Sequence, residues 1–378
     1  MLFQNPAEVR SAGGIPGALA LLHTDNGRID LVQQATSTDF PQFAEPVLEL
    51  PIDTKSLYGT ITGEFIQDVT LTPRFPLTGA LAREMWLQRY GLEVDGVIAV
   101  DPQVLSYLLA AAGPVTLSTG DVLSSDNAVQ MLLSEVYARF SDPGIQNAFF
   151  AEAASASFSQ VTSGAGEPKA LIEAFARAGN ERRILIWSAR EEDQYLLGDT
   201  LLAGDLPVSD PTVQRFGVYQ NESTASKMDY YLTTDIVISS SNCRNDGRAT
   251  MTLDVTLTNT APLDAATSLP PYVTGAAFTG FAGGEYDIPP GLTRTIVSVY
   301  GPPGAINQGA SATFEDFAVH PTVDGEYPVT SVQIQLAPGE SKTVQFTMLT
   351  EFAFRGEVEA TATPGVNTSV TNELLNIC

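Results

Sequence analysis

Basic residues are scarce in this sequence of 378 residues. It has 19 lysines and arginines against 44 aspartates and glutamates, so the formal net charge is −25 at pH 7. A surface of this sign repels a phosphate-rich polymer, and no basic run interleaved with aromatic residues occurs. The composition therefore argues against general nucleic-acid binding. The acidic residues are scattered along the chain, which is typical of a solubilising surface rather than an acidic tail.

Histidine is scarce, and the common catalytic motifs are missing. The two histidines, His23 and His320, lie far apart and neither has a partner at metal-ligand spacing, which argues against a zinc site. The sequence has no G-x-S-x-G elbow, no G-x-x-x-x-G-K-[ST] phosphate loop and no dinucleotide fingerprint. No feature singles out two carboxylates as a glycosidase pair.

Long apolar runs are also absent. No stretch of about 18 apolar residues occurs, so we expect no transmembrane helix in this sequence. Met1, Leu2 and Phe3 lead directly into a polar motif, without the charged and apolar regions of a signal peptide. This abrupt start suggests that upstream sequence has been removed.

Cysteine is represented by only two residues, Cys243 and Cys378. They can close a disulfide across the C-terminal half, which would fix a chain end that otherwise frays. The alternative is two unrelated thiols. We favour the disulfide, because a terminal cysteine has little reason to exist for packing, and a disulfide would indicate an oxidising compartment.

The clearest structural signal is the stretch 92–117. Residues 94–100 form a mostly apolar run, as in a buried strand. Asp101-Pro102 then opens a helix, because aspartate is a favoured N-cap and proline fits the first helical position. Gly113-Pro114 ends the helix and 115–117 starts another strand. This strand–helix–strand unit needs layers on both sides, which predicts an α/β core.

The rest of the N-terminal half fits around this unit. Residues 15–33 predict a hairpin with an Asn-Gly turn at Asn26-Gly27. Further elements are expected as helices at 77–90, 125–140, 146–161, 171–178 and 191–197 and a strand at 183–188.

Beyond about residue 213, β-branched residues alternate with polar ones. The strongest strand candidates are 230–239, 248–259, 294–300, 330–336 and 341–349. Segments 245–247 and 337–340 are predicted hairpin turns between pairs of them. This pattern favours an immunoglobulin-like β-sandwich. We therefore expect an α+β protein with a three-layer α/β domain at 1–205 and a β-sandwich domain at 206–378.

An acidic–basic motif precedes the first apolar run. Arg10 offers a planar fork for a carboxylate or phosphate, Glu8 lies two residues before it, and Gly13-Gly14 follow. The glycine pair either lets backbone approach a ligand or makes a bend. The alternative for the charged residues is a Glu8–Arg10 pair that holds a loop.

Several motifs together carry a family resemblance. They are Asn5-Pro6-Ala7-Glu8-Val9-Arg10, Gly13-Gly14, Asp68 before Arg74-Phe75-Pro76, residues 94–102 with Gly113-Pro114-Val115, Lys227-Met228-Asp229-Tyr230-Tyr231 and Gly301-Pro302-Pro303-Gly304. With these motifs, most of the chain resembles an uncharacterised bacterial family, domain of unknown function four-thousand-twelve, frequent in actinobacteria. The resemblance implies an extracytoplasmic or cell-surface protein, anchored in the membrane by a segment upstream of this chain.

A more distant resemblance concerns mechanism. The order of elements is similar to that of the LytR–CpsA–Psr family, which transfers glycopolymers from polyprenyl-pyrophosphate carriers to peptidoglycan. Glu8-Val9-Arg10 resembles its acid-x-Arg motif, and Tyr137-Ala138-Arg139 with Asp142 resembles the start of its later arginine-rich segment. The arginines that follow in that family are missing after Ile145, and no Pro-Arg-Asp occurs near Ser37.

The second resemblance implies a set of site residues. Arg10 and Arg139 would clamp a pyrophosphate, and Asp68 would act beside them and hold Mg²⁺. Glu8, Arg74 and Asp142 would contact the substrate. Asp101 is better explained as the N-cap of its helix.

Two hypotheses follow. In the first, the protein binds or transfers a polyprenyl-pyrophosphate-linked glycopolymer in the cell envelope, with Mg²⁺ as cofactor and an apolar cleft for the lipid. In the second, it is a non-catalytic cell-surface scaffold or binding protein whose β-sandwich is a spacer or partner site. The incomplete arginine set leaves open whether it is an enzyme.

Overall fold

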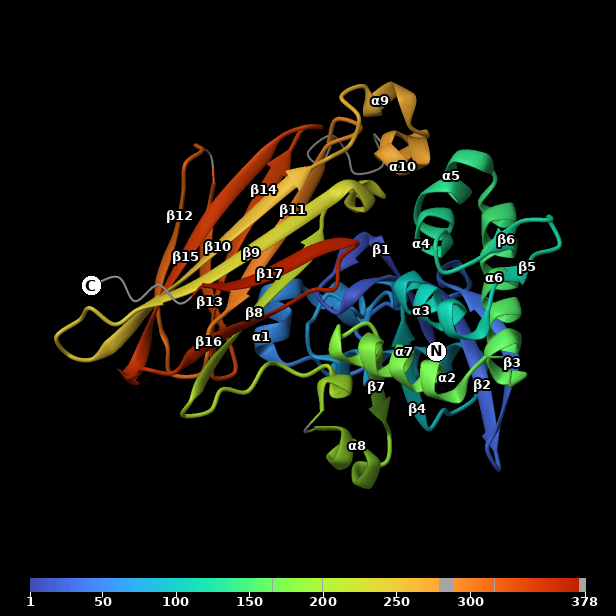
Figure 1. Ribbon diagram of the computed structural model, residues 1–378, viewed down its shortest axis with the longest axis horizontal. Helices are drawn as coiled ribbons and strands as arrows, with labels where there is room; N and C mark the ends of the chain where they lie inside the picture. Colours follow the sequence, from blue (N-terminus) through green and yellow to red (C-terminus); the bar gives the residue numbers. More distant parts are fainter. Residues whose placement is uncertain (165, 199, 279–287, 316, 374–378) are drawn as a thin grey trace. The chain divides into compact units, whose positions relative to one another are not determined.

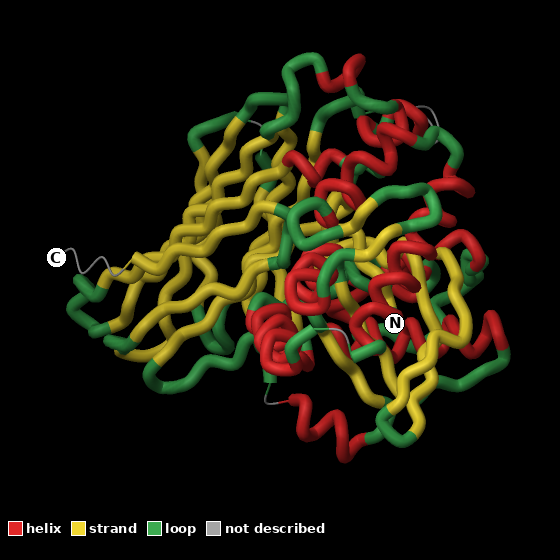
Figure 2. Tube along the Cα trace, turned by 45° about the vertical axis from the view of Figure 1, so that its right-hand side comes forward, coloured by secondary structure: helices red, strands yellow, loops and turns green. Residues whose placement is uncertain are grey.

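A computed structural model describes residues 1–164, 166–198, 200–278, 288–315 and 317–373 (Figure 1). The chain forms two compact units. Unit 1 consists of Met1–Pro6, Ala12–Leu50 and Thr60–Asp205. Unit 2 consists of Leu206–Cys378 together with two short N-terminal segments, Ala7–Ser11 and Pro51–Gly59. The protein combines helices with several β-sheets, as expected for a fold that contains both α and β elements (Figure 2).

Unit 1 is built on one five-stranded sheet with the order β3-β2-β1-β4-β7. β1 and β4 are parallel, whereas β2–β3 and β4–β7 are antiparallel pairs. Asn26 and Gly27 have φ angles of 49° and 82°, which a tight hairpin turn requires, so the predicted hairpin is confirmed. The strands are β1 (Leu2–Arg10), β2 (Gly13–Asp25), β3 (Arg28–Thr36), β4 (Gly96–Val100) and β7 (Leu185–Ser188).

The first strand was missed by the sequence analysis, which took residues 5–14 for a polar segment before the hairpin. Polar residues are accommodated because they are bonded: the buried Gln4 side chain donates to the Ala12 carbonyl at 2.9 Å. Gly14 packs directly on the backbone of Asn5, where a Cβ would come within 2.3 Å of the carbonyl oxygen. The glycine pair therefore makes a bend that returns the chain against β1.

Helices lie on both faces of β4. Val97 and Ala99 point into a core shared with α2, whereas Ile98 and Val100 pack in a cluster that includes residues of α3 and α7. Alternation of side chains along a strand produces this two-sided burial. The main helices of unit 1 are α2 (Phe75–Tyr90), α3 (Pro102–Ala112), α4 (Ala128–Gln130), α5 (Val136–Arg139), α6 (Pro143–Thr162), α7 (Pro168–Asn180) and α8 (Glu191–Gly198).

The central stretch folds largely as predicted. The Asp101 carboxylate accepts hydrogen bonds from the backbone N–H groups of Gln103 and Val104 at 2.9 and 3.0 Å, which confirms it as the N-cap of α3. Gly113 ends the helix with a φ of 91°. The following strand, β5 (Val115–Thr116), pairs only with β6 (Val122–Leu123), so it does not join the main sheet.

Unit 2 contains two five-stranded sheets, β12-β15-β10-β9-β17 and β13-β14-β11-β8-β16. Their inward side chains share one core, with Leu253 and Phe346 from the first sheet and Val297 and Val332 from the second. The strands are β8 (Val213–Glu222), β9 (Leu232–Ser241), β10 (Arg248–Asn259), β11 (Thr293–Tyr300), β12 (Ile306–Ala312), β13 (Val319–Asp324), β14 (Tyr327–Leu336), β15 (Ser341–Ala353), β16 (Glu357–Ala362) and β17 (Asn367–Glu373). Its short helices are α1 (Ile52–Tyr58), α9 (Ala265–Ser268) and α10 (Pro271–Thr274).

One of the two predicted hairpins in unit 2 is wrong. The turn at 245–247 joins β9 and β10, which pair as expected. The turn at 337–340 closes with a hydrogen bond from the Glu340 N–H to the Ala337 carbonyl at 3.0 Å, but the strands it joins belong to different sheets. β14 pairs with β11 and β13, whereas β15 pairs with β10 and β12. A tight turn thus carries the chain from one sheet to the other.

Candidate functional site

Five ionisable residues of unit 2 form what we call the buried charge cluster: Glu8, Arg10, Glu222, Lys227 and Asp229. Glu8 and Arg10 come from the N-terminal segment Ala7–Ser11, Glu222 ends β8, and Lys227 and Asp229 follow it. Only 10% of the Arg10 side chain and 2% of the Glu222 side chain are exposed. Burial of this many charges is costly unless each is paired and hydrogen-bonded, so their contacts define the site.

Arg10 is held in place by contacts within unit 2. Its Nη1 donates to the backbone carbonyls of Val9 at 3.1 Å and Glu222 at 3.0 Å, and lies 3.6 Å from the Glu222 carboxylate. The same carboxylate accepts hydrogen bonds from the backbone and the hydroxyl of Thr224. The guanidinium is therefore held among protein acceptors rather than presented to solvent.

The second pair lies between Lys227 and Glu8. The Lys227 Nζ is 2.5 Å from the Glu8 carboxylate and 4.7 Å from the centre of the Tyr272 ring. Asp229 completes the cluster by accepting a hydrogen bond from the Val9 N–H at 2.9 Å. Glu8 is thus paired with Lys227 and Arg10 with Glu222. The Glu8–Arg10 pair itself stays a prediction.

Burial raises the pKa of Glu222, although the nearby Arg10 opposes this effect. Burial also raises the pKa of Asp229 well above its usual value, and the negative charge of Glu222 raises it further. The cluster holds three carboxyl groups and two cations.

Side chains from other parts of unit 2 form hydrogen bonds with the backbone of the segment Ala7–Ser11. The Ser11 N–H donates to the Asn221 side chain at 3.0 Å, and its carbonyl accepts from the Thr363 hydroxyl at 3.0 Å. With the Asp229 contact to Val9, each of these backbone groups has a specific partner. The cluster therefore fastens this segment within unit 2.

The other predicted site residues belong to unit 1. Arg139 forms a bidentate pair with Asp121, with both N–O distances 2.9 Å. Arg74 lies 3.6 Å from Asp205, and Asp142 caps α6 by accepting from the Gly144 N–H at 2.7 Å.

Asp68 ends a 3₁₀ turn, Ile66–Asp68, and its carbonyl accepts a hydrogen bond from the Leu71 N–H at 3.1 Å. Across the described residues, no three or more His, Cys, Asp or Glu side chains are grouped so that they could hold a metal ion. The expected Mg²⁺ site at Asp68 stays a prediction.

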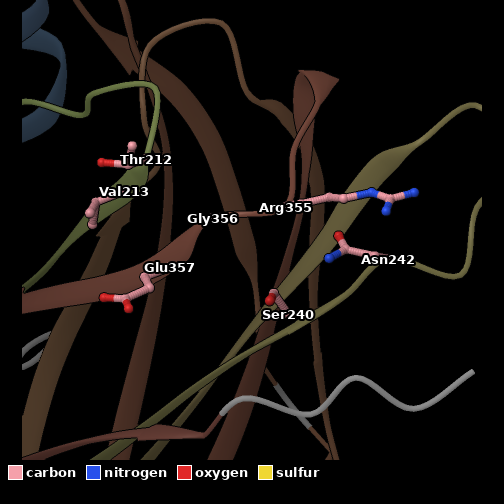
Figure 3. Close-up of a pocket in the computed structure, with 7 residues that line it drawn as sticks. All are labelled: Thr212, Val213, Ser240, Asn242, Arg355, Gly356 and Glu357. Carbon is pink, nitrogen blue, oxygen red and sulfur yellow. The ribbon is translucent and has the colours of Figure 1, made fainter.

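Unit 2 also contains a pocket of about 500 Å³ where β8 and β16 begin and β9 ends. Polar side chains and one arginine surround it (Figure 3). It is lined by Thr212, Val213, Ser240, Asn242, Arg355, Gly356 and Glu357.

Glu222, Lys227 and Asp229 were not predicted as partners of Glu8 and Arg10. One signal was available: lysine is rare in this acidic chain, and Lys227 lies two residues before Asp229. The pocket left no recognisable motif, because its residues come from three separate segments. Cys378 lies outside the described residues, so the disulfide between Cys243 and Cys378 stays a prediction. No helix among the described residues is long and apolar enough to cross a membrane.

Residues 1–137 match the model of the family described as Protein of unknown function (DUF4012). This match supports the first family resemblance over the N-terminal part of the chain. It includes Glu8, Arg10, Asp68, Arg74 and the central stretch, whereas the motif around Lys227 lies outside it.

Comparison with characterised proteins adds little. No curated protein matches the sequence. A candidate nutrient-binding protein from Legionella pneumophila is similar in structure with a TM-score of 0.22 and 7% identity, over 37% of this chain and 44% of that chain. The catalytic module of a family 98 glycoside hydrolase from Streptococcus pneumoniae gives a TM-score of 0.13 and 12% identity, over 26% and 21% of the two chains. This chain thus spans less than half of either protein.

Proposed function

We propose that this protein is a non-catalytic binding protein of the bacterial cell envelope, which holds a glycopolymer rather than transferring it. The observation that carries the proposal is the burial of Arg10. This was the residue expected to clamp a pyrophosphate, and its guanidinium is bonded to two carbonyls and paired with Glu222. Phosphoryl transfer depends on cations that contact the phosphate oxygens directly.

The remaining arginines of the predicted set have carboxylate partners as well. Arg139 would have to exchange its bidentate pair with Asp121 for a phosphate, and Arg74 would have to leave Asp205. A polymer-binding role makes no such demand, because hydroxyl-rich chains are bound by neutral and charged hydrogen-bonding groups on a surface.

The architecture we propose for this role follows the two resemblances. Unit 1, with helices on both faces of β4, would be a LytR–CpsA–Psr-like domain, and unit 2, with two sheets around one core, an immunoglobulin-like sandwich. The protein would act outside the cytoplasm, attached through a segment upstream of this chain. This location is what the family resemblance of the sequence implies, and the acidic composition is compatible with it.

The proposal is tested by binding without chemistry. Purified protein is sedimented with isolated cell-wall glycopolymer, and separately with lipid vesicles that contain polyprenyl phosphate, with and without Mg²⁺. We expect binding to the polymer that does not depend on Mg²⁺ or on Arg139→Gln. Binding confined to the polyprenyl phosphate vesicles, dependent on Mg²⁺ and lost in Arg139→Gln, would overturn it.

A further inference from the structure

A backbone contact forms one wall of the pocket at the start of β16. The Glu357 N–H donates to the Thr212 carbonyl at 2.9 Å, which brings the start of β16 against the chain before β8. Gly356 lies so close that a Cβ there would come within 2.0 Å of the Thr212 oxygen. Only glycine permits this approach, so the pocket shape depends on it.

An unused acceptor faces the pocket. The Oδ1 of Asn242 is buried and makes no hydrogen bond among the residues that the structure describes. Leaving such an atom without a partner costs about 1–3 kcal/mol, so native proteins rarely do so unless a ligand or water supplies the donor. A ligand of this pocket should therefore carry a hydrogen-bond donor, such as a hydroxyl group.

Charges of opposite sign flank this amide. Figure 3 shows Glu357 on one side with Thr212 and Val213, and the Arg355 side chain on the other side next to Asn242, with its head group pointing away from Glu357; Ser240 lies between the two sides. In the described chain, no carboxylate pairs with Arg355. A guanidinium is a planar fork that matches a carboxylate, and the Glu357 carboxylate can only accept hydrogen bonds at neutral pH.

We propose that this pocket binds an acidic sugar, with its carboxylate on Arg355 and its hydroxyl groups on Asn242, Ser240 and Glu357. The Thr212 hydroxyl already donates to Asp210 at 2.6 Å and so offers a further acceptor. Several acceptors beside one cation suit a polyhydroxylated carboxylate better than a peptide end, which brings one N–H per residue. The volume of about 500 Å³ has room for a disaccharide.

This inference rests on the proposed function, since it assigns uronic acid units to the glycopolymer. It is tested by calorimetric titration of the whole protein with galacturonate disaccharide, with the methyl ester of the same sugar, with a neutral disaccharide and with a dipeptide that has a free carboxylate. We expect only the free acid to bind. Esterification removes the negative charge of the ligand, so the comparison of the acid with its ester tests this charge without a protein variant.

Two substitutions, each of which removes one positive charge, locate the site. Arg355→Gln should weaken binding by about tenfold or more, as expected for loss of a hydrogen bond to a charged group. Arg294→Gln is the control, because Arg294 lies in β11 of the same unit and bonds Gln335 at 3.0 Å, outside the pocket.

The outcomes separate the inference from the proposed function. Equal binding of the acid and its ester, equal loss in both arginine variants, or preference for the dipeptide overturns the acidic-sugar assignment. Polymer sedimentation that persists in Arg355→Gln leaves the proposed function intact and removes this site from it. Galacturonate binding without any polymer binding supports the pocket and contradicts the function.

Discussion

Replacing Arg10 by methionine tests whether the buried charge cluster stabilises unit 2. Methionine keeps the length of the apolar stem but removes the cation 3.6 Å from the Glu222 carboxylate. Because this carboxylate side chain is only 2% exposed, water cannot replace the arginine. Removing one partner of a buried pair costs about 3–5 kcal/mol. We expect Arg10→Met to lower the free energy of unfolding by this amount.

A double-mutant cycle with Glu222→Gln separates the charge pair from the other contacts of Arg10. The double variant removes both charges, so it should be more stable than the sum of the two single effects predicts, by about 1–3 kcal/mol. Recovery is incomplete because the carbonyls of Val9 and Glu222 still lose their donor. Acidification should also relieve the single variant Arg10→Met, since protonation removes the unpaired charge of Glu222.

The assay is thermal unfolding followed by far-ultraviolet circular dichroism, to which the strands of unit 2 and the helices of unit 1 both contribute. A loss of about 3–5 kcal/mol corresponds to roughly 6–20 °C for a unit of 150–250 residues. Arg244→Met is the control, because Arg244 forms an exposed pair with Asp246 at 2.7 Å and should leave the midpoint unchanged. An effect of Arg10→Met no larger than the control, or strict additivity in the cycle, refutes the reasoning.

Two further substitutions test individual groups. The pKa of Asp229 is raised in the folded state, so the wild type loses stability as pH rises from about 4 towards that pKa. Asp229→Asn keeps an acceptor for the Val9 N–H, and its free energy of unfolding, measured in urea, should increase relative to that of the wild type over this pH range. A constant difference between the two proteins would contradict this sign. Asp101→Ala removes the cap of α3 and the partner of Arg183, whose side chain is 11% exposed, and should cost about 3 kcal/mol in unfolding followed by tryptophan fluorescence. Both tryptophans belong to unit 1, so an unchanged fluorescence midpoint would count against the structural role of Asp101.

Local signals in the sequence predicted local structure well. The Asn26-Gly27 turn and the Asp101 cap were correct because each depends on residues that are neighbours in the chain. The turn at 337–340 was also correct as a turn. Its strands were assigned to one hairpin because a turn does not specify whether the next strand stays in the same sheet.

The buried charge cluster could not be predicted in the same way. Glu8 and Lys227 are 219 residues apart, and periodicity carries no information about such pairs. The polar residues of β1 suggested a loop because patterns of hydrophobicity assume that polar groups face water. Here Gln4 and Arg10 are buried and donate hydrogen bonds to backbone carbonyls elsewhere in the chain, which a single sequence does not reveal.

A transfer assay tests the absence of catalysis most directly. The protein is incubated with a polyprenyl-pyrophosphate-linked glycan, acceptor peptidoglycan and Mg²⁺, and release of the polyprenyl phosphate is measured against a sample without protein. We predict that the glycan is bound and that release stays at the background rate. Mg²⁺-dependent release that disappears in Arg139→Gln, while Arg244→Met retains it, would contradict a purely binding role.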